Sequence, residues 1–318
     1  MPYAVLGLGL LALLPHVASH TTILDDFTST TDFNLNSNWA FFQAGDLIGN
    51  DGIVSLGKDG LSVISPGTVD GHPAFTLEAD SDLDHVKWLV TANHTASSGY
   101  PGFDTGVRTS CSARLRGEVY GVEDNDPRPA FVASVNGDFE RSFMFDFAVT
   151  NDAVYALYER LPFARTPDNH YASFTYLVRA ADRSPKDWHD MRVTYDRPAR
   201  AVTWYLEGEE VLKVDKIGHY LGPEHEGNLY IDRGGLEEEV PELRQLTCGF
   251  GSFSLMDSTI DDKPGLVRLV ETEGYYVRPA EFLVGDRLIG QGTKLEVASV
   301  SVSIEEKNEE VKHEHDEL

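Results

Sequence analysis

The sequence predicts an all-β protein built as a sandwich or a barrel. Short runs of β-branched and aromatic residues follow one another along the chain, and Gly, Pro, Asn and Asp separate them. Helical periodicity is scarce, and no repeat of fixed period indicates a propeller. Many short strands joined by polar turns are typical of sheets that pack face to face or close into a barrel.

Two early segments, Ile23–Phe27 and Asn38–Phe42, resemble the first strands of β-sandwiches. A longer series of predicted strands starts near residue 60 and continues almost to the C-terminus. This series begins with Gly60–Ser65, His85–Ala92, Cys111–Gly121, Ala130–Val135, Ser142–Thr150, Ala153–Phe163, Ser173–Ala180 and Met191–Asp196. Residues 201–215 predict a hairpin that turns at Glu207-Gly208. The last strand, 294–305, alternates in polarity, which predicts that Leu295 and Val297 face one way and Val300 the other.

The passage DWHDMRVTYDRPARAVTWYLEGEEVLKVDKIG (Asp187–Gly218) resembles the concanavalin-A-like jelly rolls of lectins and family-16-type glucanases. A more specific resemblance covers 22–218 and rests on YERLPFAR (Tyr158–Arg165) and WYLEGEEV (Trp204–Val211). It is to a family of fungal and actinobacterial secreted proteins. The resemblance implies a jelly-roll β-sandwich with a core at 22–218 and additional C-terminal strands at 219–304, and it implies no particular activity.

The two ends of the chain predict a location. Residues 1–19 have the apolar run and small residues of a secretory signal peptide, and the run is too short for a comfortable membrane span. Residues 305–318 predict an acidic disordered tail that ends in a retention signal, His315-Asp316-Glu317-Leu318. We therefore expect the lumen of the endoplasmic reticulum, with the retention receptor as one partner. The alternative for the C-terminus is a solvated acidic tail.

Two further features agree with that compartment. Asn93-His94-Thr95 is an N-glycosylation sequon beside small polar residues that predict a surface loop. Cys111 and Cys248 predict one disulfide, with two buried thiols as the alternative. The net charge of −26, from 52 acidic against 26 basic residues, argues against binding nucleic acid or an anionic membrane. The oligomeric state is not predicted.

Familiar catalytic motifs are missing. The glucanase pattern E-x-D-x-x-E does not occur, and the nearest acidic cluster, around Glu123 and Asp126, reads as a solvated turn. The histidines form no HxH, HExxH or Cys/His cluster, so no metal site is predicted. There is no G-x-S-x-G and no phosphate loop, and no cofactor is predicted.

Two neighbouring strands supply the candidate site, because each places carboxylates among apolar residues. In the first strand, alternation puts the Phe residues on one face and Asp146 on the other. In the second, alternation puts Glu159 on one face and Tyr158 and Arg160 on the other. The candidate catalytic residues are Asp146, Tyr158, Glu159 and Arg160, and the candidate ligand contacts are Phe143, Phe145, Phe147, Tyr155, Trp188 and Trp204. The alternatives are solvent-facing carboxylates paired with Arg, and aromatic residues that belong to the core.

Three functions fit these observations. The favoured one is a biosynthetic enzyme of secondary metabolism that binds an apolar terpenoid or polyketide and catalyses a metal-free cyclisation or isomerisation, of the Diels–Alderase kind. Such a reaction needs shape, exclusion of water and one or two hydrogen bonds. The others are a glycan-binding lectin and a glycosidase.

Overall fold

The structure is a computed structural model that describes residues 17–28, 33, 35, 37–42, 48–76, 86–122, 126–255, 257–260, 263–266 and 290–307. Most of the predicted signal peptide, residues 1–16, lies outside the described residues. The retention signal His315–Leu318 lies outside them altogether.

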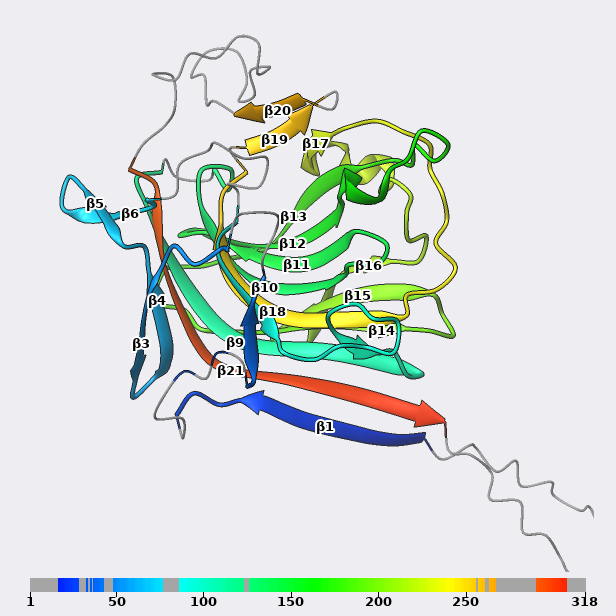
Figure 1. Cartoon of the computed structure of the whole chain (residues 1–318), viewed down its shortest axis with the longest axis horizontal. Coiled ribbons are helices and arrows are strands. Elements are labelled where there is room, and N and C mark those ends of the chain that lie inside the picture. Colours follow the sequence, from blue (N-terminus) through cyan, green and yellow to red (C-terminus); the bar gives the residue numbers. More distant parts are fainter. Residues whose placement is uncertain are drawn as a thin grey trace, which may run out of the picture.

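Two antiparallel sheets form the body of the protein. Sheet A has the order β16-β15-β14-β9-β21-β4-β3, with β1 paired to β21. Its strands are β1 (Val17–Asp25), β3 (Ile53–Gly57), β4 (Gly60–Ile64), β9 (Arg108–Tyr120), β14 (His189–Asp196), β15 (Ala201–Leu206), β16 (Glu209–Val214) and β21 (Gly292–Lys307). Figure 1 shows this sheet as the lower layer, beneath β11, β12 and β13.

Sheet B has the order β17-β13-β12-β11-β10-β18-β7-β2, with β8 paired to β18. Its strands are β2 (Trp39–Phe41), β7 (Val86–Ala92), β8 (Phe103–Asp104), β10 (Phe131–Asp138), β11 (Phe143–Val149), β12 (Ala153–Arg160), β13 (Phe174–Asp182), β17 (Leu229–Asp232) and β18 (Gln245–Phe253). Smaller elements are β5 (Gly67–Val69), β6 (His72–Ala74), β19 (Asp257–Ile260), β20 (Lys263–Leu266) and the short helices η1 (Pro162–Ala164) and η2 (Pro223–Asn228). The predicted all-β, jelly-roll-like sandwich is confirmed.

The strands after Gly218 complete the middle of both sheets. β18 lies between β10 and β7, and β21 lies between β9 and β4. β21 continues to Lys307, inside the predicted acidic tail, and Lys307 pairs with Val17 at the start of β1. The sandwich therefore includes residues from both predicted terminal segments.

A bulge in β21 changes the predicted facing of the last strand. The register against β9 shifts between Val297 and Ser299, so Ala298 is an extra residue. An extra residue reverses the alternation beyond it. Leu295, Val297, Val300 and Val302 are consequently all buried in the same core. The prediction that Val300 faces away from Leu295 and Val297 is wrong.

The hairpin between β15 and β16 turns at the predicted residues. Glu207 and Gly208 have φ of 52° and 87°. Positive φ at both central residues is the geometry of the tightest hairpin turns, and Gly adopts it without steric penalty.

The main core fills the space between the sheets and is rich in aromatic residues. Its largest fully buried side chains include Trp39, Trp88, Trp204, Tyr158, Tyr195, Phe143, Phe145, Phe147 and Phe174. Cys111 on β9 and Cys248 on β18 form a disulfide across this core, with Cα atoms 5.6 Å apart. The predicted disulfide is confirmed, and it joins the two sheets covalently.

Sheet B is apolar on its outer face as well. A second cluster, made of residues that alternate with those of the main core, includes Val86, Leu89, Phe131, Val135, Met144 and Leu157. For this reason β7, β10, β11 and β18 are buried at every position rather than at every second one. The outer face of sheet B is the floor of the candidate site.

A buried carboxyl at the end of β10 makes stability depend on pH. Asp138 is 0 % exposed, and its Oδ1 accepts hydrogen bonds from the Arg141 amide and the Gln245 side chain. Its Oδ2 has no partner among the described residues. Burial is the main cause that raises the pKa of Asp138 from 3.8 to about 6.

We expect Asp138→Asn to raise the free energy of unfolding at neutral pH by roughly 1–3 kcal/mol. An acid whose pKa is raised by folding stabilises the fold below 3.8 and loses that contribution as the pH rises through about 6. The difference in the free energy of unfolding between variant and wild type should therefore become smaller as the pH falls from about 6 to 3.8. Urea unfolding across the pH range measures it, with exposed Asp168→Asn as the control. A gap that is constant with pH would contradict the assignment.

Candidate functional site

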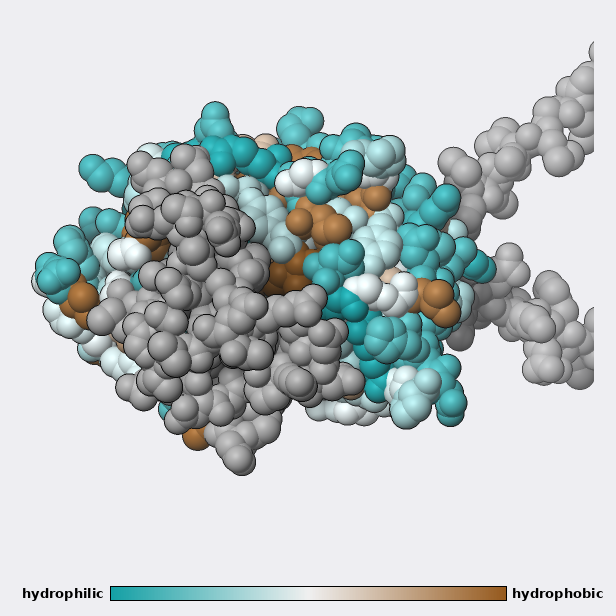
Figure 2. Space-filling view, turned by 90° about the horizontal axis from the view of Figure 1, so that it is seen from above, coloured by the Kyte–Doolittle hydropathy of each residue, from teal (hydrophilic) through white to brown (hydrophobic). Residues whose placement is uncertain are grey.

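A groove lies on the outer face of sheet B and has a volume of about 310 Å³. Apolar side chains from the strands and the adjoining loops line most of it, among them Phe42, Val135, Phe139, Met144, Leu157 and Leu161. The polar residues in its lining are Tyr100, Ser142, Asp146, Glu159, Arg233 and Ser254. Figure 2 shows hydrophobic residues gathered in a hollow of this face, with hydrophilic residues along one side of them. A concave, mostly apolar site with few polar groups is the usual form of a small-molecule site.

Asp146 lies in the floor of the groove and is 6 % exposed. The alternation of β11 turns it outward, away from Phe145 and Phe147. Its Oδ1 accepts the backbone N–H of Asn136 at 2.7 Å. Burial raises the pKa of Asp146 well above its ordinary value, the Asn136 hydrogen bond opposes the rise, and the negative charge of Glu159 adds to it. Asp146 is therefore a carboxyl group that its surroundings favour in the neutral form.

Glu159 lines the same groove from the neighbouring strand. β11 and β12 pair so that Met144 lies opposite Glu159 and Asp146 lies opposite Leu157. Asp146 and Glu159 are thus diagonal neighbours on one face of the sheet. The hydroxyl of Thr175, on β13, donates a hydrogen bond to Glu159 Oε1. Glu159 is half-buried, and the groove therefore holds two carboxyl groups of unequal exposure.

Tyr158 and Arg160 lie on the opposite face of β12 and point into the main core. Tyr158 is 0 % exposed, and its hydroxyl accepts the backbone N–H of Gly218 at 2.7 Å. Arg160 is 3 % exposed, with its guanidinium 3.8 Å from the centre of the Tyr171 ring and 4.9 Å from that of Phe143. Neither residue lines the groove, so the structure does not bring the four candidate catalytic residues together.

Most of the predicted ligand contacts belong to the core as well. Phe143, Phe145, Phe147 and Trp204 are all 0 % exposed between the two sheets. The Trp204 indole donates a hydrogen bond to the backbone carbonyl of Asp146 at 2.9 Å. The prediction that these residues line a pocket is wrong. The groove is on the other face of β11 from the three Phe residues, and Trp204 lies on β15 of sheet A.

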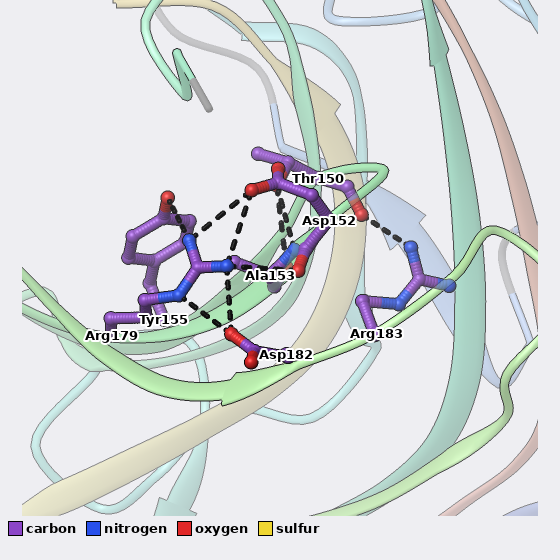
Figure 3. A network of polar contacts seen from close by, with 7 residues as sticks. All are labelled: Thr150, Asp152, Ala153, Tyr155, Arg179, Asp182 and Arg183. Carbon is purple, nitrogen blue, oxygen red and sulfur yellow. Dashed lines mark hydrogen bonds and ion pairs between the residues drawn. The ribbon is translucent and has the colours of Figure 1, made fainter. Parts of the chain in front are cut away.

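Tyr155 lies on the groove side of sheet B but at its margin. Figure 3 shows its hydroxyl beside Arg179, which also contacts Asp152 and Asp182. The Arg179 nitrogens lie 3.3 Å from the Tyr155 hydroxyl and 3.2 Å from Asp152 Oδ2. Burial raises the pKa of Tyr155. Arg179 thus connects Asp152, in the turn between β11 and β12, to Asp182 at the end of β13. Tyr155 therefore has a structural role as a contact of Arg179.

The remaining predicted residues lie away from the groove. The ring of Trp188 packs under the Arg116 guanidinium at 4.7 Å, and Arg116 pairs with Glu296 at 2.8 Å on sheet A. Asn93 is exposed directly after β7, and its glycosylation stays a prediction. Among the described residues there is no group of three or more His, Cys, Asp or Glu side chains placed to hold a metal ion. None of the helices in the described part of the chain is long and apolar enough to cross a membrane.

Sequence reasoning missed the loop residues that border the groove. Arg233 follows β17, Phe139 follows β10, and Leu161 and Phe163 flank the start of η1. The sequence does carry a signal for the floor: FVASV (Phe131–Val135) is apolar at nearly every position rather than at every second one. A strand of this kind is buried on both faces.

Comparison with known proteins shows the family of the chain. Residues 24–306 match the "Family of unknown function (DUF6081)", and the chain belongs to this family. It is also similar to "Uncharacterized protein L829" of Acanthamoeba polyphaga mimivirus, with 27% identity over 297 residues that cover 72% of this chain and 64% of that protein. The chain thus spans about 64% of the length of this relative. The fungal or actinobacterial origin of the family stays a prediction.

The solved structures that this chain is similar to share little sequence with it. An endo-1,3-beta-glucanase from Streptomyces sioyaensis has a TM-score of 0.44 and 11% identity, over 92% of this chain and 99% of its own. The apo Crh5 transglycosylase has a TM-score of 0.43 and 15% identity, over 91% and 85%. A Bacillus licheniformis beta-glucanase has a TM-score of 0.42 and 8% identity, over 89% and 97%. Similarity at this level carries no argument about activity.

Proposed function

We propose that the groove on sheet B binds an apolar small molecule and that the protein promotes a metal-free isomerisation or cyclisation of it. The observation that carries this proposal is an apolar groove of about 310 Å³ that contains two carboxyl groups, Asp146 and Glu159. Small-molecule sites have volumes of roughly 300–1,000 Å³ and a few polar groups in an apolar lining. A terpenoid or polyketide precursor suits a site of this size and polarity.

The groove has the parts that such a reaction needs. Its apolar walls exclude water and restrict the shape of a bound molecule. A neutral carboxyl and a second carboxyl on adjacent strands can give and take protons, and positioned acid–base groups contribute typically 10²–10⁴-fold to a rate. Tyr158 and Arg160 have no part in this proposal because they lie in the core.

Binding of N-phenylnaphthylamine, a neutral apolar fluorescent dye, tests the proposal. The wild type should bind the dye, and Leu161→Glu should weaken binding by about tenfold or more, because a charge beside the apolar ligand is poorly solvated. Leu161 is half-buried in the lining of the groove. Ile53→Glu is the matched control, since Ile53 is 55% exposed on β3 of sheet A. Equal loss in both variants, or no binding by the wild type, would refute the proposal.

A glycan ligand is the second candidate, and the pair of carboxyl groups favours it. Glycoside hydrolysis uses two carboxyl groups that flank the scissile bond. The apolar lining opposes a sugar, because hydroxyl groups buried there without partners are destabilised. Incubation with gluco-oligosaccharides separates the two candidates. Hydrolysis by the wild type that is lost in Glu159→Gln would favour the glycosidase.

The endoplasmic reticulum lumen is the location we propose, with the retention receptor as a partner. Three observations support it: the disulfide between Cys111 and Cys248, the exposed sequon at Asn93, and the sequence His-Asp-Glu-Leu at 315–318. Deleting His315–Leu318 should release the protein into the medium, with its affinity for the dye unchanged. Unaltered retention after the deletion would contradict the proposed receptor contact.

A further inference from the structure

Asp146 offers one of its two carboxyl oxygens to the groove. Oδ1 is occupied by the Asn136 amide, whose nitrogen lies 2.7 Å away. That contact is the one hydrogen bond of the Asp146 carboxyl within the described part of the chain, and the residue keeps 6 % exposure in the lining of the groove. Oδ2 is therefore the oxygen that a ligand can reach.

The surroundings of Asp146 disfavour a negative charge there. Met144 and Leu157, its apolar neighbours on the same face, shield it from water. The other ionisable side chains in the groove lining are Glu159, Arg233 and Tyr100. Of these, Glu159 is the group whose charge raises the pKa of Asp146, because a like charge close by favours the neutral form. No ion pair within the described residues includes Asp146. An uncompensated carboxylate in such a place would be strongly destabilised, whereas a protonated one is not.

We infer that Asp146 carries a proton on Oδ2 and donates a hydrogen bond to an acceptor oxygen of the ligand, so that the groove selects apolar molecules that bear a carbonyl group. A carbonyl oxygen accepts this bond and has no hydrogen of its own to be left unpaired. The selectivity deepens the proposed function and rests on it, since the ligand must first bind in the groove. It does not depend on which reaction follows.

Two bicyclic probes of nearly equal shape test the selectivity. Decalone bears a carbonyl group, and methylenedecalin has a CH₂ group in place of the oxygen. Each displaces N-phenylnaphthylamine from the groove in a fluorescence titration. The wild type should bind decalone about three- to tenfold more tightly than methylenedecalin, which is the contribution of one hydrogen bond.

Two substitutions assign the preference to Asp146. Asp146→Leu removes the donor and should bind the two probes equally. Asp146→Asn keeps an acceptor for the Asn136 amide and presents an N–H₂ donor to the groove, so it should keep the preference. The wild-type preference should fall as the pH rises and Asp146 loses its proton, whereas that of Asp146→Asn should not change. If Asp146→Leu does not fold, this pH comparison still decides.

The outcomes separate this inference from the proposed function. Equal binding of the two probes by the wild type would overturn the inference and leave the apolar groove as a binding site. A preference retained by Asp146→Leu would overturn it as well. Failure of the wild type to bind the dye would refute the proposed function, and the inference with it.

Discussion

Replacing Cys111 and Cys248 together by alanine is expected to lower the free energy of unfolding by roughly 2–5 kcal/mol. The two residues are 137 positions apart, and a disulfide that closes a long loop restricts the unfolded chain strongly. Both cysteines are buried, 3% and 0% exposed, and each comes from a different sheet. The bond therefore limits how far the segments around Cys111 and Cys248 can separate in the unfolded chain.

Urea unfolding with and without a reductant measures this effect. Reductant should lower the stability of the wild type toward that of the double variant and should leave the variant unchanged. The dependence of stability on urea should become steeper without the bond, because the unfolded chain then exposes more surface. A wild type that unfolds at the same urea concentration in both conditions would show that the bond contributes little.

Local patterns were enough to predict the fold class, the hairpin turn and the disulfide. The fold class and the hairpin rest on properties that act within a few residues, such as the positive φ that Gly208 adopts. The disulfide follows from the presence of two cysteines in the sequence. The bulge at Ala298 was missed, although the sequence carries a signal for it. The apolar residues of β21 lie at odd positions up to Val297 and at even positions from Val300, and the register shift against β9 falls between the two sets.

The candidate site was predicted in part, for a similar reason. Alternation correctly separated Phe145 from Asp146, and Tyr158 from Glu159. It did not say which face would meet sheet A, because both faces of β11 and β12 are rich in apolar residues. Asp146 and Glu159 were therefore grouped with aromatic residues that lie on the other side of the same strands. The packing of sheet A against one face of these strands decides which residues lie in the core and which line the groove.

Phe145 provides the clearest test of this division between core and groove. We expect Phe145→Ala to lower the free energy of unfolding by roughly 3–5 kcal/mol, as large-to-small changes in a core do. The Phe145 ring is 0 % exposed, and its centre lies 5.8 Å from that of Trp204 and 6.2 Å from that of Tyr158. Sheet A seals this space, so little relaxation can fill the cavity. Affinity for N-phenylnaphthylamine should change little as long as the variant is folded.

Phe139→Ala is the matched change on the groove side. Phe139 is half-buried after β10, where its ring stacks on Phe42 with centres 4.8 Å apart, and both line the groove. Its removal should weaken dye binding severalfold and lower stability by less than Phe145→Ala does, because a partly exposed ring buries less apolar area. Thermal or urea unfolding together with dye titration gives both quantities for each variant. If Phe145→Ala abolished binding in a folded protein while Phe139→Ala did not, the ligand would have to enter between the sheets. Aromatic residues that the sequence predicts as ligand contacts, such as Phe143, Phe145 and Phe147, would then contact the ligand.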